Sequence, residues 1–172
     1  VAAFFGAQWA GCFYSVLNTE LPGPRLNQIA AQLRPAVIVT CRELLAQARD
    51  IFPGQSLVCL EDLAKTPEED AALAAIQARA IDTDPLYVNF TSGSTGVPKG
   101  IVVSSRSVLD FIGCFTELFG ITEADVIANQ APFDFDVSVK DIYSAVKAGA
   151  TLAVVPRQLF SVPTELMDFL CE

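Results

Sequence analysis

The sequence predicts an α/β fold with mainly parallel sheets flanked by helices. First, apolar runs of strand length alternate with amphipathic helical segments along most of the chain, which is the pattern of parallel α/β proteins. Second, the run 36–40 (Ala-Val-Ile-Val-Thr) is apolar at successive positions, as in strands buried on both faces. Third, glycine or proline stands at most of the breaks between segments, where turns and helix ends need it.

Residues 1–19 carry no charged side chain, so a membrane helix is one interpretation of this stretch. Polar residues and glycines interrupt it and no basic flank precedes it, which favours a buried helix over 1–10, a stop at Gly11 and a strand over 12–17. The next helix follows the break at 22–24 and ends before Pro35. Its apolar residues recur at helical spacing: Leu26, Ile29, Ala30 and Leu33.

Short strands over 36–40 and 56–60 enclose a predicted helix over 41–49 and a turn at Pro53-Gly54. Glu68-Glu69-Asp70 then precedes an alanine-rich run, and acids favour the N-terminus of a helix. We therefore interpret these acids as the solvated start of a helix rather than as metal ligands.

The second half of the chain continues the alternation. Strands are predicted over 86–90, over 101–103, within 124–131 and over 151–155. Helices are predicted from the capping serines at 104–107 to about 119, from Asp134 or Asp136 to Lys147, and over 162–170. Gly149 is the predicted stop of the middle helix.

Composition excludes several classes of function. The net charge is −9 at pH 7 and no basic run occurs, which argues against a nucleic-acid partner or an anionic membrane surface. The five cysteines form no Cys-x-x-Cys pair and histidine is absent, so no metal site is predicted. Four of the cysteines lie among apolar neighbours. We interpret them as buried thiols in a reducing, cytoplasmic compartment.

The stretch from Thr91 to Gly100 carries the strongest functional signal. It follows the apolar strand 86–90 and holds four hydroxyl side chains, three glycines and Lys99 within ten residues. Glycines permit positive φ, so that backbone N–H groups can converge on an anion. Hydroxyls add neutral donors, and the lysine adds a point charge suited to a phosphate oxygen. A polar hairpin loop is the simpler alternative.

This stretch differs from better-known catalytic loops. Pro98 and Gly100 occupy the places of the glycine and the Ser/Thr that flank the lysine of a P-loop. A Gly-x-Ser-x-Gly elbow and a Gly-x-Gly-x-x-Gly motif are both absent, and no histidine exists for a Ser-His-Asp triad.

Instead the stretch resembles the phosphate loop of the adenylate-forming (AMP-binding) enzymes, which include acyl-CoA synthetases, peptide-synthetase adenylation domains and D-alanine–carrier protein ligases. The family pattern stands unbroken from Leu86 to Gly100. The resemblance implies these ATP-phosphate contacts: Thr91, Ser92, Gly93, Ser94, Thr95, Gly96, Lys99 and Gly100, with Lys99 as the catalytic residue. Residues 11–26 resemble a second family segment, with departures at Ser15 and Asn18.

In this family a carboxylate reacts with ATP to give an acyl-adenylate and pyrophosphate, with Mg²⁺ held mainly through the phosphates. The acyl group then passes to a phosphopantetheine thiol. Such enzymes need several hundred residues, and their Tyr-Gly-x-Thr-Glu motif and C-terminal lysine domain are absent here. We therefore expect residues 1–172 to be an inactive piece of the large N-terminal domain, truncated at both ends. It would comprise a first α/β portion (1–80) and a portion with the phosphate loop (81–172). The apolar content of 52%, with 18% charged residues, suits a surface that missing parts would cover.

Phe135-Asp136-Val137-Ser138 resembles the Phe-Asp-x-Ser segment of members that activate amino acids. The resemblance implies that Asp136 binds the substrate ammonium and that Phe135, Val137 and Lys140 line the pocket. The alternative for Asp136 is helix capping, and for Lys140 a surface ion pair with Asp136. The prediction is thus an amino acid–AMP ligase that serves a carrier protein. The alternatives are an acyl-CoA synthetase-type ligase and a non-catalytic nucleotide-binding module.

Overall fold

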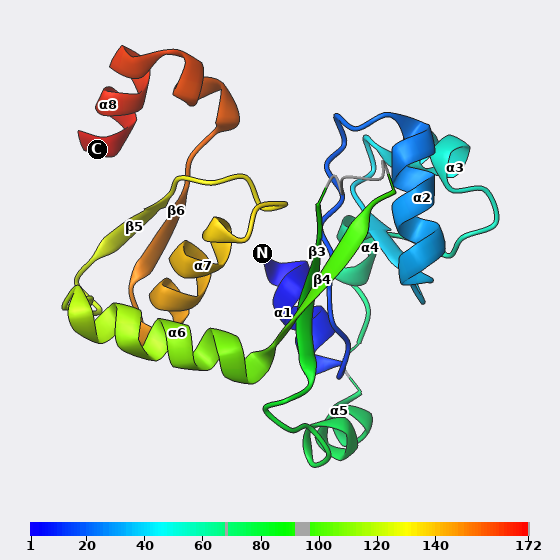
Figure 1. Cartoon of the computed structure of the whole chain (residues 1–172), viewed down its shortest axis with the longest axis horizontal. Helices are drawn as coiled ribbons and strands as arrows, with labels where there is room; N and C mark the ends of the chain where they lie inside the picture. Colours follow the sequence, from blue (N-terminus) through cyan, green and yellow to red (C-terminus); the bar gives the residue numbers. More distant parts are fainter. Residues whose placement is uncertain (68, 92–96, 172) are drawn as a thin grey trace. The chain divides into compact units, whose positions relative to one another are not determined.

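The computed structural model describes residues 1–67, 69–91 and 97–171 (Figure 1). The chain divides into two compact units, Val1–Ser104 and Ser105–Glu172. The boundary falls later than the division expected between residues 80 and 81, which concerned portions of a longer domain and stays a prediction. In the described ranges, no helix combines the length and the apolar character needed to cross a membrane.

The first unit combines helices with two pairs of strands. Its helices are α1 (Ala2–Trp9), α2 (Gly23–Leu33), α3 (Leu45–Ile51), α4 (Leu60–Leu63) and α5 (Asp70–Gln77). Its strands are β1 (Ile38–Thr40), β2 (Leu57–Cys59), β3 (Pro85–Thr91) and β4 (Lys99–Ser104). β1 and β2 pair in parallel, with Ile38 opposite Leu57, as expected for an α/β fold with mainly parallel sheets. The burial on both faces expected for 36–40 was wrong, because Val39, on the opposite face of the strand from Ile38, is exposed.

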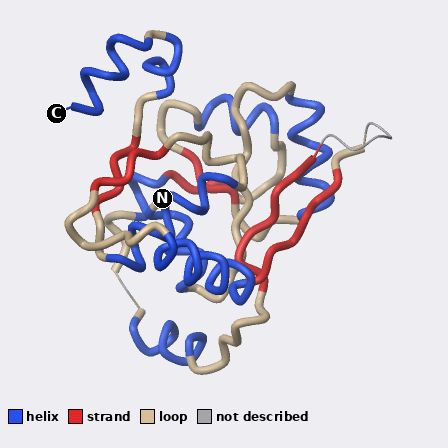
Figure 2. The backbone as a smooth tube through the Cα atoms, turned by 60° about the vertical axis from the view of Figure 1, so that its left-hand side comes forward, coloured by secondary structure: helices blue, strands red, loops and turns tan. Residues whose placement is uncertain are grey.

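β3 and β4 pair antiparallel, from Pro85 opposite Ser104 to Thr91 opposite Lys99 (Figure 2). Residues 92–98 are too few for the crossover of about a dozen residues that a parallel pair requires. This pair is therefore the exception to the mainly parallel arrangement. Both strands were predicted, and each is longer in the structure than the sequence indicated.

A small core lies between α2, α3 and β1. Its buried residues are Leu26, Ala30, Ile38, Ala48 and Phe52. The helical spacing predicted for α2 is confirmed, because Ile29 is buried as well. The helix ends where Arg34 takes φ +48°, directly before Pro35, since the residue before a proline disfavours continued helix.

Three further predictions for the first unit were wrong in detail. α1 has no buried residue, because a helix that is apolar all round leaves one side uncovered, and its Trp9 is 60% exposed. Among the described residues, segment 12–17 pairs with a strand only through a bridge between Tyr14 and Tyr87. The helix predicted over 41–49 begins at Leu45, because residues 42–44 form a turn.

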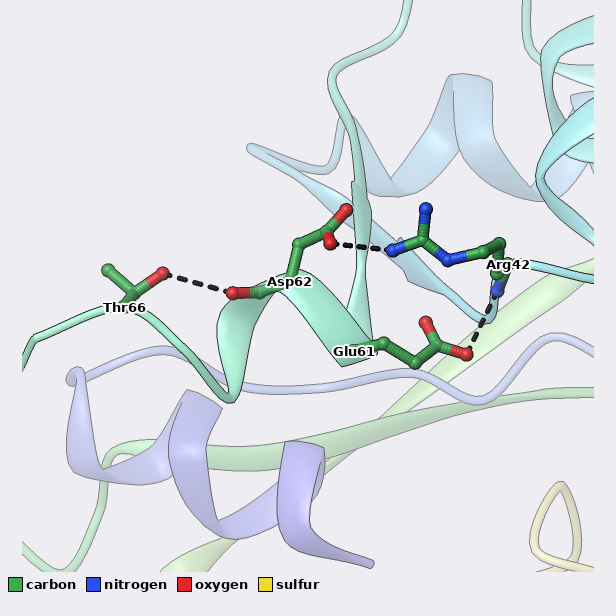
Figure 3. Close-up of polar contacts among 4 residues, drawn as sticks. All are labelled: Arg42, Glu61, Asp62 and Thr66. Atoms are coloured by element: carbon green, nitrogen blue, oxygen red, sulfur yellow. Dashed lines mark hydrogen bonds and ion pairs between the residues drawn. The ribbon is translucent and has the colours of Figure 1, made fainter.

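Polar contacts join α4 to the end of β1 (Figure 3). The Arg42 guanidinium donates to Asp62 Oδ1 at 2.6 Å, and its backbone N–H donates to Glu61 Oε1 at 3.1 Å. The second bond lowers the pKa of the Glu61 carboxyl, and the bond to Asp62 raises the pKa of Arg42. The side chains of Arg42 and Asp62 are more than half exposed, so the ion pair adds little stability.

The second unit is built around a parallel strand pair. Its elements are α6 (Ser105–Leu118), β5 (Val126–Asn129), α7 (Val137–Ala148), β6 (Thr151–Val154), the 3-10 helix η1 (Arg157–Ser161) and α8 (Pro163–Cys171). β5 and β6 pair in parallel with α7 as the connection, and α7 packs against both α6 and β5 (Figure 1). Gly149 ends α7 with φ +71°, and this predicted stop is confirmed.

The cysteines differ from the sequence-based expectation. All five are free thiols, but only Cys59 is buried and Cys41 is half-buried. The other three are exposed: Cys12, Cys114 and Cys171. Cys12 follows the Gly11 turn, and Cys171 ends the last helix. Apolar neighbours along the sequence therefore did not place these thiols in a core.

Candidate functional site

The structure describes the two ends of the predicted phosphate loop. Thr91 ends β3 and Lys99 begins β4, and the two residues lie opposite each other in the strand pair. Lys99 is exposed, so its ammonium is accessible from solvent. The predicted loop residues Ser92, Gly93, Ser94, Thr95 and Gly96 lie outside the described residues, so their phosphate contacts stay predictions.

Two side chains of α2 contact the ends of the loop. Gln32 Nε2 donates to the carbonyl of Pro98 at 2.9 Å, and Arg25 Nη2 donates to the carbonyl of Thr91 at 3.4 Å. Residues seven apart in a helix lie on the same face. Pro98 is less than 2% exposed. One face of α2 therefore holds the backbone on both sides of the loop, directly next to Lys99.

Gly100 follows Lys99 at a place where a side chain would be crowded. A Cβ atom there would lie 3.1 Å from Val88 Cγ1 and 3.2 Å from Phe90 Cζ. Glycine thus allows the side chains of β3 to pack across β4 beside the loop. Its predicted phosphate contact stays a prediction.

Asp136 stands at the N-cap position of α7, directly before Val137. Its carboxylate makes no capping hydrogen bond, and its backbone is already helical, with φ −61° and ψ −26°. The side chain is exposed, as are the flanking Phe135 and Val137. The capping alternative therefore lacks the hydrogen bond that defines it, although the charge still suits a helix N-terminus.

Lys140 lies one turn further along α7. Its Nζ is 3.2 Å from Asp141 Oδ1 and 6.0 Å from the centroid of the Phe115 ring. The side chain is 27% exposed. The surface ion pair considered from the sequence joined Lys140 to Asp136; the structure joins it to Asp141 instead.

Asp141 is a residue that sequence reasoning missed. Its residue surface is 3% exposed, and Oδ2 accepts hydrogen bonds from the backbone N–H of Gln130 at 3.1 Å and from Asn129 Nδ2 at 3.3 Å. An acid at helical spacing with the buried positions of α7, next to Ile142, was a signal that could have identified it. Gln32 had no such signal, because its acceptor is a backbone carbonyl that any residue possesses.

The described residues include no group of three or more His, Cys, Asp or Glu side chains that could hold a metal ion. The loop ends belong to the first unit, and Asp136, Lys140 and Asp141 belong to the second. Each of these residue sets is described within its own unit: a lysine beside the predicted loop in the first, and in the second an exposed carboxylate that makes no capping hydrogen bond at a helix start.

The sequence profile of the AMP-binding enzyme family matches residues 1–172. An L-proline–[L-prolyl-carrier protein] ligase of Pseudomonas fluorescens is 36% identical, over 99% of this chain and 35% of that protein. A D-alanine–D-alanyl carrier protein ligase of Staphylococcus aureus is 30% identical, over 99% of this chain and 33% of that protein. The chain therefore spans about a third of the length of these relatives.

Solved structures agree with this match. The Vibrio cholerae adenylation domain AlmE, in complex with glycyl-adenosine-5'-phosphate, superposes with a TM-score of 0.79 at 21% identity, over 96% of this chain and 35% of that chain. The nonribosomal peptide synthetase FmoA3, bound to α-methyl-L-serine-AMP, gives a TM-score of 0.74 at 28% identity, over 90% of this chain and 16% of that chain. The α/β fold is that of part of an adenylation domain.

Proposed function

Because the chain belongs to the AMP-binding enzyme family, we propose that it is part of an ATP-dependent ligase that activates an amino acid. In this reaction a carboxylate oxygen of the amino acid attacks the α-phosphorus of ATP, the bond to the β-phosphate oxygen breaks, and pyrophosphate leaves. The product is an aminoacyl-adenylate. Its aminoacyl group would pass to a phosphopantetheine thiol of a carrier protein, because the proline and D-alanine relatives are named as carrier-protein ligases.

In this proposal, Lys99 and the loop that precedes it bind the phosphates of ATP. Negative charge builds on the leaving pyrophosphate, and donors fixed in advance at that place lower the barrier. The exposed ammonium of Lys99 can reach a phosphate oxygen, with Thr91 and residues 92–96 as further donors. Mg²⁺ would neutralise phosphate charge, held chiefly through phosphate oxygens.

Recognition of the amino-acid substrate is the central part of the proposal, and the exposed carboxylate of Asp136 is the observation that supports it. Its carboxylate is exposed and makes no capping bond, so it is available to pair with the substrate ammonium. A carboxylate–ammonium contact in a site from which water is excluded is strong and charge-assisted. Phe135 and Val137 flank it with apolar surface, and Lys140 one turn away is the candidate contact for the substrate side chain.

The test is ATP–pyrophosphate exchange by the full-length enzyme that contains this chain, with a panel of amino acids and their des-amino analogues. Asp136→Asn keeps the shape of the side chain and removes its charge. We expect kcat/KM for the amino acid to fall by about a hundredfold or more, with KM for ATP nearly unchanged, since the buried ammonium loses its counter-ion. Asp134→Asn, the same change two residues earlier, is the matched control and should have a much smaller effect.

Each alternative function has its own outcome in this assay. Exchange that is as fast with des-amino carboxylates as with amino acids would contradict the role of Asp136 and favour an acyl-CoA synthetase-type ligase. Absence of exchange with every carboxylate, together with measurable ATP binding, would favour a non-catalytic nucleotide-binding module.

A further inference from the structure

Asp141 is a buried carboxylate for which the proposed chemistry has no direct use. It lies on the inner face of α7 between Ser138 and Ile142, which are 2% and 1% exposed. A carboxylate is costly to bury unless donors surround it. A carboxylate on this buried face therefore needs hydrogen-bond or ionic partners, and the structure supplies three.

The two oxygens of Asp141 have different partners. Oδ2 accepts the bonds from the Gln130 backbone and from the Asn129 side chain, and Oδ1 contacts Lys140 Nζ. Asn129 is the last residue of β5 and is itself buried. Asp141 thus joins the second turn of α7 to the end of β5.

These contacts link the start of the segment 130–136 to the helix at its other end. The segment contains Phe135 and Asp136. The segment leaves β5 at Gln130 and enters α7 at Val137, and Asp141 reaches from the helix back to the first residue of the segment. Inside it, the Phe135 N–H donates to the Pro132 carbonyl at 3.0 Å, and Ser138 Oγ of α7 donates to the Phe135 carbonyl at 2.7 Å. Both ends of the segment are therefore held to α7.

We propose that Asp141 is a positioning residue for the amino-acid end of the site, because it fixes the segment that presents Asp136 to the substrate. This inference rests on the proposed function. A carboxylate that is held before the substrate arrives need not reorganise on binding. Asp141 touches neither substrate nor reacting atoms in this role; it acts through Asp136.

The charge of Asp141 matters as well as its shape. In Asp141→Asn, one of the two side-chain atoms becomes an NH₂ group. That group would face either the donors of Asn129 and Gln130 or the ammonium of Lys140, so donor would meet donor on one side. We expect KM for the amino acid to rise about tenfold or more in the full-length enzyme, with KM for ATP changed less than about twofold.

Ser144→Ala is the matched control on the same helix face. Ser144 is 1% exposed, and its hydroxyl has no hydrogen-bond partner in the described part of the chain, so its removal disturbs the same packing without breaking a contact. It should leave both KM values unchanged. Should Asp141→Asn fail to fold, Asn129→Ala removes one donor to the carboxylate and should raise KM for the amino acid alone, by about threefold.

The decisive measurement is the double variant Asp136→Asn/Asp141→Asn. If Asp141 acts through Asp136, the second change adds little to the first. Independent, multiplying effects would overturn the proposal, as would equal rises in both KM values or a Ser144→Ala variant that behaves like Asp141→Asn. If instead Asp136→Asn itself has no effect on amino-acid activation, the proposed function fails. If Asp136→Asn lowers kcat/KM for the amino acid as expected and Asp141→Asn leaves both KM values unchanged, only this inference fails.

Discussion

The hydrogen bond from Gln32 to Pro98 allows a quantitative test of how α2 affects the phosphate loop. Gln32→Met keeps the length of the side chain and removes the donor that lies 2.9 Å from the Pro98 carbonyl. Pro98 has no backbone N–H and is almost fully buried. Its carbonyl directly precedes Lys99, so a change in this bond is transmitted to the lysine through a single peptide link.

The size of the effect follows from the burial of the bond. A buried acceptor left without a partner costs about 1–3 kcal/mol. Gln32 is exposed and the bond is only partly buried, so water replaces part of the loss and a value near the lower limit applies. A loss of about 1 kcal/mol corresponds to about a fivefold change in rate or affinity.

We therefore expect Gln32→Met to lower kcat/KM for ATP by about fivefold in pyrophosphate exchange, with KM for the amino acid unchanged. Gln28→Met is the matched control, because Gln28 lies one turn earlier on α2 and is exposed. Equal kinetics for the two variants, or a Gln32→Met effect confined to the urea midpoint of unfolding, would refute the reasoning that this bond positions Lys99.

Three further predictions test other residues. Lys99→Ala should reduce exchange by about tenfold or more, since a charged contact to the leaving pyrophosphate is lost; normal exchange at low and saturating ATP would rule out the role of Lys99. Lys140→Met should lower the enzyme's preference for amino acids with acidic side chains, measured over the substrate panel. An unchanged preference would show that Lys140 does not line the pocket. Gly149→Ala should lower the free energy of unfolding by about 1 kcal/mol, because the residue has φ +71°. Steric overlap adds little, since the new Cβ would lie 3.8 Å from Glu123, an ordinary contact. The control Gly113→Ala, inside α6, should not lower the free energy of unfolding.

Local patterns were sufficient to predict much of this fold. The spacing of Leu26, Ile29 and Ala30 predicted α2, Gly149 predicted the end of α7, and the ten residues from Thr91 identified the family that the profile match confirms. Each of these signals lies within a few neighbouring residues, where helix periodicity, glycine conformation and motif spacing act directly.

Contacts between distant residues were not predictable in the same way. Gln32 and Pro98 are 66 positions apart, and nothing in a glutamine on a helix indicates which carbonyl it will meet. The strand predicted over 12–17 was wrong for a related reason, because strand pairing depends on a partner edge that the segment itself does not encode. Asp141 lies between these cases: its spacing with the buried positions of α7 was visible in the sequence, whereas its partners were not.

The pairing of Thr91 with Lys99 has a consequence for how this protein tolerates changes in chain length. Side chains alternate between the two faces of a strand, so deleting one residue of β4 after Lys99 would turn Lys99 to the opposite face relative to the rest of the strand. A deletion between residues 92 and 96 leaves the strand pair aligned and alters only the span of the loop. Insertions and deletions a few positions apart should therefore differ sharply in effect: those in the loop change the reach toward the proposed phosphates, and single-residue changes in β4 after Lys99 remove the lysine from its side of the sheet.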